Sequence, residues 1–164
     1  MSIFPTKILV ATDGSEEAFL AAGTAADLAK STGSELHVVI IFQESANVDP
    51  YYEVRFPKAA ERLRQQALEE IQNVLDEQVE RIRKSGVEVA EAHLRTGAPN
   101  GEIIALAEEI GAGLIVMGSR GLGGVRRALM GSVSDSVVRH AHSPVLVMRQ
   151  EKERPAEHKA DFLT

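Results

Sequence analysis

The sequence predicts an α/β protein with a five-stranded, parallel, doubly wound sheet, and three observations support this fold class. Short apolar runs rich in Val, Ile and Leu recur along the chain, as in strands that are buried on both faces. Between them lie longer segments whose apolar residues have the spacing of one helical face. Gly, Pro and Ser separate the two kinds of segment. Such alternation is typical of a parallel sheet with helices on both faces.

The first strand is expected at Lys7–Thr12 and the second at Leu36–Phe42. Between them, Ser15 is a suitable helix N-cap, and two glutamates follow it in the first turn, where carboxylates favour the helix dipole. Gly33 is expected to end this helix, as glycine commonly does. One face of the helix carries small residues that allow close packing on a sheet: Ala18, Ala22, Ala25 and Ala29.

The section from Gln43 to Pro57 is the least regular, and we expect a loop or a partly ordered lid there. A long amphipathic helix is predicted at Lys58–Ser85, followed by a third strand at Val87–Leu94. The outer face of this helix is rich in Glu, Arg and Gln. Its apolar face comprises Leu63, Ala67, Ile71, Leu75, Val79 and Ile82.

The C-terminal part continues the alternation. Pro99 suits the first turn of a helix that ends at Gly111. A fourth strand is predicted at Leu114–Met117, a further helix at Ser132–His142 and a fifth strand at Pro144–Met148. These elements complete the five strands of the predicted sheet.

Composition limits the classes of protein that fit. The 164 residues suit one domain, which we expect at residues 1–150, with a charged C-terminal tail at 151–164. The chain has no cysteine, which excludes disulfides and thiolate metal sites. Its net charge of −6 argues against a nucleic-acid partner. No apolar run suits a signal peptide or a membrane span, so we expect a cytoplasmic protein without a membrane partner.

A glycine-rich segment from Met117 to Ser134 follows the fourth predicted strand and leads into a helix. In open α/β sheets, ligands lie beyond the carboxyl ends of the strands. Glycines permit positive φ angles and close approach of backbone amides, and a helix N-terminus attracts phosphate. Positive charge in this acidic protein comes from Arg120, Arg126 and Arg127, of which the last two are also interpretable as surface charges.

Other interpretations of the segment remain open. A P-loop requires a lysine that the segment lacks, and a dinucleotide fingerprint started at Gly121 would require glycine where Arg126 stands. A glycine-rich loop can also serve only to turn the chain, and Ser132 with Asp135 has the pattern of a capping box. Asp13, at the end of the first strand, is interpretable either as a turn residue or as a nucleotide contact.

The spacing Gly118-x2-Gly121-x9-Gly131-Ser132 resembles the ATP-binding signature of the universal stress protein family, G-2x-G-9x-G-[S/T], at every fixed position. The opening Thr12-Asp13-Gly14-Ser15, the alanine-rich first helix and the closing Ser-Pro-Val-Leu-Val also resemble that family. The resemblance covers about Lys7 to Arg149. It implies strand order 3-2-1-4-5, with one cleft between the first and fourth strands.

The resemblance further implies ATP as ligand, alone or with Mg²⁺ or Mn²⁺ bound through its phosphates. The implied adenosine side consists of Ala11, Thr12, Asp13, Ile41, Met117 and Gly118. The implied phosphate cradle consists of Arg120, Gly121, Gly131, Ser132, Val133 and Ser134. A homodimer through the strand at residues 144–148 is implied as well.

Three functions fit these observations. The first is an ATP-binding regulatory or stress-response protein, because no nucleophile–base grouping accompanies the loop and an efficient enzyme is not expected. The second is a slow ATPase or phosphoryl transferase that uses the same cleft, with Asp13 or Ser132 in the chemistry. The third is a dimeric interaction module without nucleotide turnover.

The histidines are interpreted as structural, and no metal site formed by protein side chains is expected. His37 and His93 fall inside predicted strands, where satisfied structural roles are common. His140 and His142 lie two residues apart, which on a helix directs them to different faces.

Overall fold

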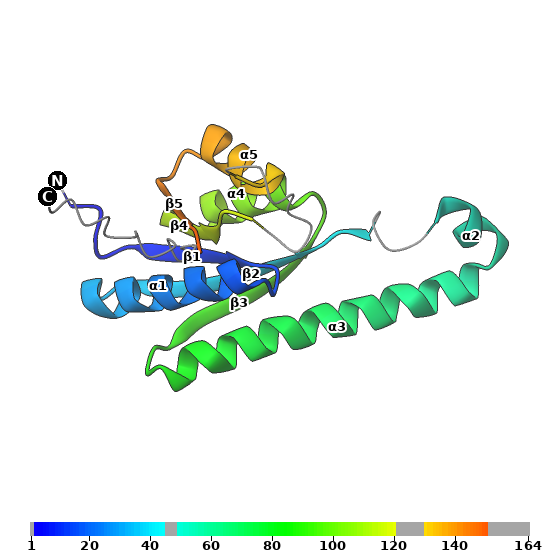
Figure 1. Ribbon diagram of the computed structural model, residues 1–164, viewed down its shortest axis with the longest axis horizontal. Helices are drawn as coiled ribbons and strands as arrows, with labels where there is room; N and C mark the ends of the chain where they lie inside the picture. Colours follow the sequence, from blue (N-terminus) through cyan, green and yellow to red (C-terminus); the bar gives the residue numbers. More distant parts are fainter. Residues whose placement is uncertain (1, 45–48, 121–129, 151–164) are drawn as a thin grey trace, which may run out of the picture.

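The computed structural model describes residues 2–44, 49–120 and 130–150 and contains a five-stranded parallel sheet with strand order β3-β2-β1-β4-β5 (Figure 1). The fold class and the strand order are therefore confirmed, whereas the predicted tail at 151–164 lies outside the described residues. The strands are β1 (Lys7–Thr12), β2 (Glu35–Phe42), β3 (Val89–Thr96), β4 (Ala112–Gly118) and β5 (Val145–Met148). The helices are α1 (Glu16–Thr32), α2 (Pro50–Arg55), α3 (Pro57–Lys84), α4 (Pro99–Ile110) and α5 (Ser132–His140).

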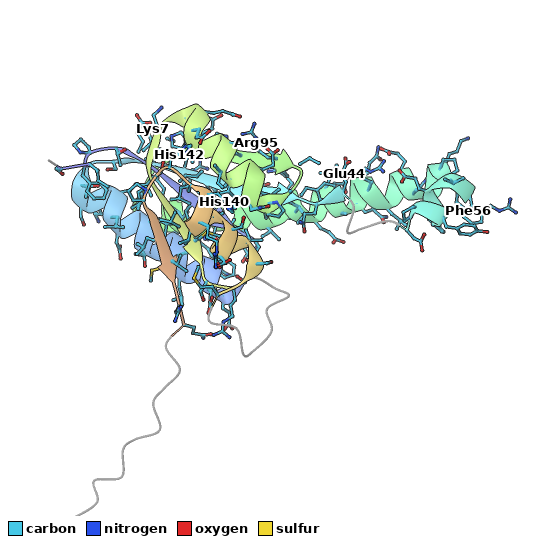
Figure 2. The ribbon with its side chains drawn as sticks, turned by 90° about the horizontal axis from the view of Figure 1, so that it is seen from above. Lys7, Glu44, Phe56, Arg95, His140 and His142 are labelled. Atoms are coloured by element: carbon cyan, nitrogen blue, oxygen red, sulfur yellow. The ribbon has the colours of Figure 1, made fainter. Side chains whose placement is uncertain are left out.

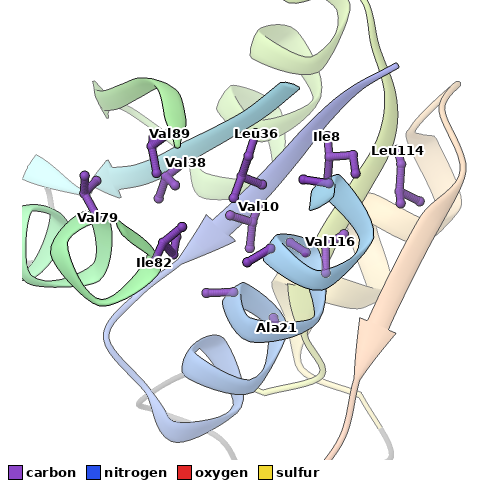
Figure 3. Close-up of a cluster of buried hydrophobic side chains, with 14 of the residues drawn as sticks. Ile8, Val10, Ala21, Leu36, Val38, Val79, Ile82, Val89, Leu114 and Val116 are labelled. Atoms are coloured by element: carbon purple, nitrogen blue, oxygen red, sulfur yellow. The ribbon is translucent and has the colours of Figure 1, made fainter. Parts of the chain in front are cut away.

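Helices cover both faces of the sheet, as Figure 1 shows. On one face, residues such as Val10, Val38 and Val116 pack against the alanine face of α1 and against Val79 and Ile82 of α3 (Figure 3). On the other face, Leu9, Val39 and Ile115 pack against α4 and α5. The near-continuous apolar strands of the sequence follow from this arrangement, because both sides of the central strands are removed from water.

The ends of the first helix confirm the predicted signals. The Ser15 hydroxyl accepts a hydrogen bond from the Ala18 backbone N–H at 3.2 Å and caps α1. Gly33 has a φ of 66° and ends the helix in the left-handed conformation.

Some boundaries differ from the prediction. The section 43–57 was expected to be irregular, but it contains α2, which Asp49 caps by accepting a hydrogen bond from Tyr51 N–H at 2.8 Å. The predicted third strand at 87–94 is wrong by two residues at each end, because β3 pairs with β2 from Val89 to Thr96. The last helix ends at His140 rather than His142.

The long helix α3 extends past the sheet and carries α2 at its far end (Figure 1). Phe56, between the two helices, lies at this far end of the molecule (Figure 2). Tyr51 and Val54 of α2 are exposed there. Within the part of the chain that the structure describes, no helix combines the length and the apolar character needed to cross a membrane.

Candidate nucleotide-binding site

The candidate site lies at the carboxyl ends of β1 and β4, which are neighbours in the sheet. Strand order reverses between these strands, since β2 lies on one side of β1 and β4 on the other. The first turn of α1 and the first turn of α5 both open at this edge, because each helix starts shortly after a strand end or the glycine-rich loop. Two helix N-termini at a topological switch point form an edge suited to an anion.

Glu17, in the first turn of α1, holds the end of β4. Its Oε2 accepts hydrogen bonds from the Ser119 hydroxyl at 2.6 Å and from the Arg120 backbone N–H at 2.7 Å. Its Oε1 accepts from the Gln150 backbone N–H at 3.4 Å. Sequence reasoning placed Glu17 only as a carboxylate that favours the helix dipole, and no local pattern signals its contact with Ser119, a partner 102 positions away.

The charge of Glu17 is stabilised by these contacts. Burial alone would raise the pKa of Glu17, but the hydrogen bonds from Ser119, Arg120 and Gln150 together lower this pKa below its ordinary value of 4.5. A carboxyl whose pKa is lower in the folded state than in the unfolded state stabilises the fold above the unfolded pKa. That stabilisation is lost as the pH falls through the folded pKa.

We expect Glu17→Gln to lower the free energy of unfolding at pH 7 by about 1–2 kcal/mol, the scale of hydrogen bonds to a half-buried charged group. The difference from the wild type should shrink as the pH falls below about 4.5, the ordinary pKa of this carboxyl, and should be lost once the pH is below the lower pKa of folded Glu17. Urea denaturation across this pH range measures it. Glu16→Gln is the matched control, because it removes the same charge from the same helix turn and should cost less than about 0.5 kcal/mol. Equal costs for the two variants would contradict this role of Glu17.

The start of α5 is fixed against the end of β4. The Gly131 backbone N–H donates to the Ser119 carbonyl at 2.6 Å, and the buried Ser134 hydroxyl donates to the same carbonyl at 2.7 Å. Gly131 is the N-cap of α5, so the alternative interpretation of Ser132 and Asp135 as a capping box is wrong. Ser132 is the first residue of the helix and is exposed. The first-turn amides have no carbonyl partner inside a helix and are the natural donors to an anion.

Arg120 contributes a second feature suited to an anion. Its Nε is buried and has no hydrogen-bond partner among the described residues. A buried donor without a partner costs free energy, and an incoming acceptor would remove that cost. Gly121, Arg126 and Arg127, also expected in or near the phosphate cradle, lie outside the described residues.

Gly118 and Gly131 lie where the two helices α1 and α5 come close to the end of β4. Neither has a positive φ, so the left-handed backbone that glycine permits is not used at these two positions. A Cβ on Gly118 would lie 2.9 Å from the Cβ of Glu17 and 3.0 Å from its carbonyl carbon. A Cβ on Gly131 would lie 3.2 Å from the Ser119 carbonyl oxygen. These two glycines therefore let α1 and α5 approach the end of β4.

The structure brings four of the residues expected around the nucleotide into one apolar cluster. Ala11 of β1 and Met117 of β4 are buried in the cluster between the sheet and α4 and α5. Ile41 of β2 and Val133 of α5 pack against the same cluster and are only partly buried. Their side chains form one apolar wall, which α4 and α5 largely cover.

Thr12 and Asp13 make hydrogen bonds within the protein. The Thr12 side chain lies toward α3, where its hydroxyl donates to Gln78 Oε1 at 3.1 Å. Asp13 Oδ1 accepts from the Ser15 backbone N–H at 2.9 Å, which is the geometry of an Asx turn. The turn interpretation of Asp13 is thus confirmed, and its contact with a nucleotide stays a prediction.

Comparison with known proteins agrees with the geometry. The model of the universal stress protein family matches residues 5–149. A universal stress protein of Methanocaldococcus jannaschii is 33% identical over 146 residues, which cover 89% of this chain and 83% of the relative. The solved structure of a family member from Burkholderia pseudomallei has a TM-score of 0.67 at 30% identity, covering 90% of this chain and 98% of that one.

The structure of a universal stress protein from Archaeoglobus fulgidus, solved in complex with dAMP, has a TM-score of 0.63 at 25% identity. The match covers 90% of this chain and 99% of that protein's chain. The family model spans nearly the whole of the described chain. The five strands of the sheet, the turn after β1 and the start of α5 at Gly131–Ser132 all lie within the matched residues. This chain therefore belongs to the universal stress protein family.

Proposed function

We propose that this protein binds ATP at the edge where β1 and β4 end and acts as a nucleotide-dependent regulatory protein in a stress response. The observation that carries the proposal is the buried Arg120 Nε, which has no partner among the described residues. The Cα of Arg120 lies 3.5 Å from the position of a Cβ on Gly131, the N-cap of α5. An anionic phosphate would accept from Arg120 and from the first-turn amides of α5. The apolar wall of Ala11, Ile41 and Met117 would take the adenine.

The relative from Archaeoglobus fulgidus supports an adenine nucleotide, since that protein was solved with dAMP. Three phosphates place more negative charge at the cradle than one does, which favours ATP over AMP here. A divalent ion, Mg²⁺ or Mn²⁺, would be carried by the phosphates of the nucleotide. Asp13 directly follows β1 in the sequence and is the carboxylate that we propose to face this ion.

Regulation is favoured over efficient catalysis. The hydrogen bonds described around Ser119, Gly131 and Ser134 involve no histidine. The Ser134 hydroxyl, the buried one of the cradle, donates to a backbone carbonyl rather than to a base. Slow ATP hydrolysis in the same cleft is the second candidate, and its sign would be ADP in the reaction mixture.

The test is a calorimetric titration of the nucleotide-stripped full chain with adenosine, AMP, ADP and ATP in the presence of Mg²⁺. We expect affinity to rise with each phosphate, because each one brings negative charge to α5 and Arg120. Equal affinity for adenosine and ATP would contradict the phosphate cradle, and no heat with any ligand would contradict the proposal. ADP formation at about 1 s⁻¹ or faster would favour the enzyme.

We infer that the same chain forms a homodimer through β5. This strand is at the edge of the sheet, and its four residues, Val145–Met148, are apolar and only partly buried. An exposed apolar edge strand offers unpaired backbone groups to a second copy. Sedimentation velocity should show a dimer, and a monomer mass that does not depend on concentration would contradict it.

A further inference from the structure

A second group of polar side chains lies on the edge of the sheet, away from the nucleotide site. His37 is on β2, and Glu91 and His93 are on β3. In the parallel register His37 pairs with Glu91 and Val39 pairs with His93, so the three side chains share one face of the sheet. One ligand atom from each of the three lies within 4.8 Å of the others.

The two imidazoles have the spacing of metal ligands. His37 Nδ1 lies 3.2 Å from His93 Nε2, with the rings stacked at an interplanar angle of 18°. Zn–N bonds of about 2.0–2.1 Å in a tetrahedral site separate two ligand nitrogens by about 3.3 Å. Glu91 Oε2 lies 3.8 Å from His93 Nε2, and its exposed side chain is free to close on a shared ion. The two imidazole nitrogens therefore have the separation of two corners of one coordination sphere, and Glu91 would complete a third by a small movement of its side chain.

The second ring nitrogen of His37 gives an independent indication. His37 is only 5% exposed, yet its Nε2 has no hydrogen-bond partner among the described residues. The structural role expected for this histidine is therefore met at Nδ1, which contacts His93, but not at Nε2. Glu35 Oε2 lies 3.5 Å from this Nε2. If Nδ1 binds a cation, Nε2 carries the proton and faces a carboxylate, which is how metal-binding histidines are commonly oriented.

The surroundings supply charge and access. Glu35 and Glu91 bring two carboxylates to a site that would gain two positive charges. A surface depression beside β3 is lined by Glu91, His93, Arg95 and residues of α4. A water molecule could reach a fourth position from that side. Nitrogen and oxygen ligands in tetrahedral geometry favour Zn²⁺ and Co²⁺ over Ca²⁺ or Mg²⁺.

We propose that His37, His93 and Glu91 bind one divalent transition-metal ion, and that this ion is Zn²⁺ in the native protein. Glu35 is the residue that positions His37. This site is separate from the proposed nucleotide site, because it lies on β2 and β3 rather than at the ends of β1 and β4. Ion binding there would tie the edge strand β3 to β2. It would raise the melting temperature in proportion to the logarithm of free zinc concentration above the dissociation constant.

The test is a titration of the chelator-treated, nucleotide-free full chain with Zn²⁺, followed by calorimetry and thermal unfolding, and with Co²⁺ followed by visible absorption. We expect one ion per chain and the intense absorption bands of tetrahedral Co²⁺. His93→Gln should weaken binding at least about 30-fold, and Glu91→Gln about 10-fold, because each removes one ligand. His93 is the preferred variant, since it is less buried than His37 and its loss is the easier one for the fold to tolerate.

The matched controls remove chemically similar residues elsewhere. His142→Gln removes a surface histidine that contacts Glu108 at 2.8 Å, and Glu88→Gln removes an exposed carboxylate just before β3. Both controls should leave zinc affinity unchanged. Zinc binding that survives His93→Gln, or that is lost with His142→Gln, would overturn the proposal, as would the absence of any binding by the wild type. None of these readouts depends on nucleotide, so failure here leaves the ATP proposal standing.

Discussion

Gly118→Ala is expected to lower the free energy of unfolding by about 2–3 kcal/mol, the cost of overfilling a packed position. The new Cβ would lie 2.9 Å from the Cβ of Glu17 and 3.0 Å from its backbone carbonyl carbon. Backbone atoms cannot rotate out of the way as a side chain can, so the start of α1 would have to move from β4. That shift would also weaken the hydrogen bonds from Ser119 and Arg120 to Glu17. Denaturant unfolding measures the loss.

Gly23→Ala is the matched control for Gly118→Ala. Gly23 lies in the middle of α1, and a Cβ there would meet nothing within 4 Å. The same substitution should therefore stabilise the protein by up to about 1 kcal/mol, because alanine is the better helix former. A Gly118→Ala protein as stable as the wild type would show that α1 does not need to approach β4 so closely.

The parts of the fold that follow from local chemistry were predictable from the sequence. Helix α1 begins after Ser15 and ends at Gly33, as expected, because capping and left-handed termination depend on only a few adjacent residues. Leu75, Val79 and Ile82 are buried because a helix of regular period presents them to one side. The strand order came from the family resemblance, since the apolar strands alone do not specify which neighbours pair.

The parts that depend on distances between elements were not predictable. Glu17 was recognisable as a first-turn carboxylate, but its role as an acceptor for Ser119 arises only once α1 packs beside β4. The glycine at 118 was assigned to positive φ angles and to close approach of backbone amides to a ligand, whereas in the structure it clears space for Glu17. The group of His37 and His93 was missed for the same reason, because register between β2 and β3 creates it.

Ser132→Glu is expected to weaken ATP binding by at least about 100-fold, or about 2.7 kcal/mol. Ser132 is the first residue of α5, exposed, and next to the amides proposed to hold the phosphates. A carboxylate there would repel the phosphates and compete for the same donors. The fold should be unharmed, because a negative charge in the first turn favours the helix dipole. Calorimetry gives the affinity, and unfolding at the same pH checks stability.

Ser132→Gln separates the effect of charge from that of size. Glutamine has nearly the shape of glutamate without its charge, so ATP affinity should fall less than about tenfold. The gap between the two variants should widen from AMP to ATP, because repulsion grows with the number of phosphates that reach α5. Equal losses in both variants would mean that position 132 limits space rather than charge. If neither variant loses affinity, the nucleotide lies elsewhere, and the buried Arg120 Nε must find its acceptor in another part of the chain.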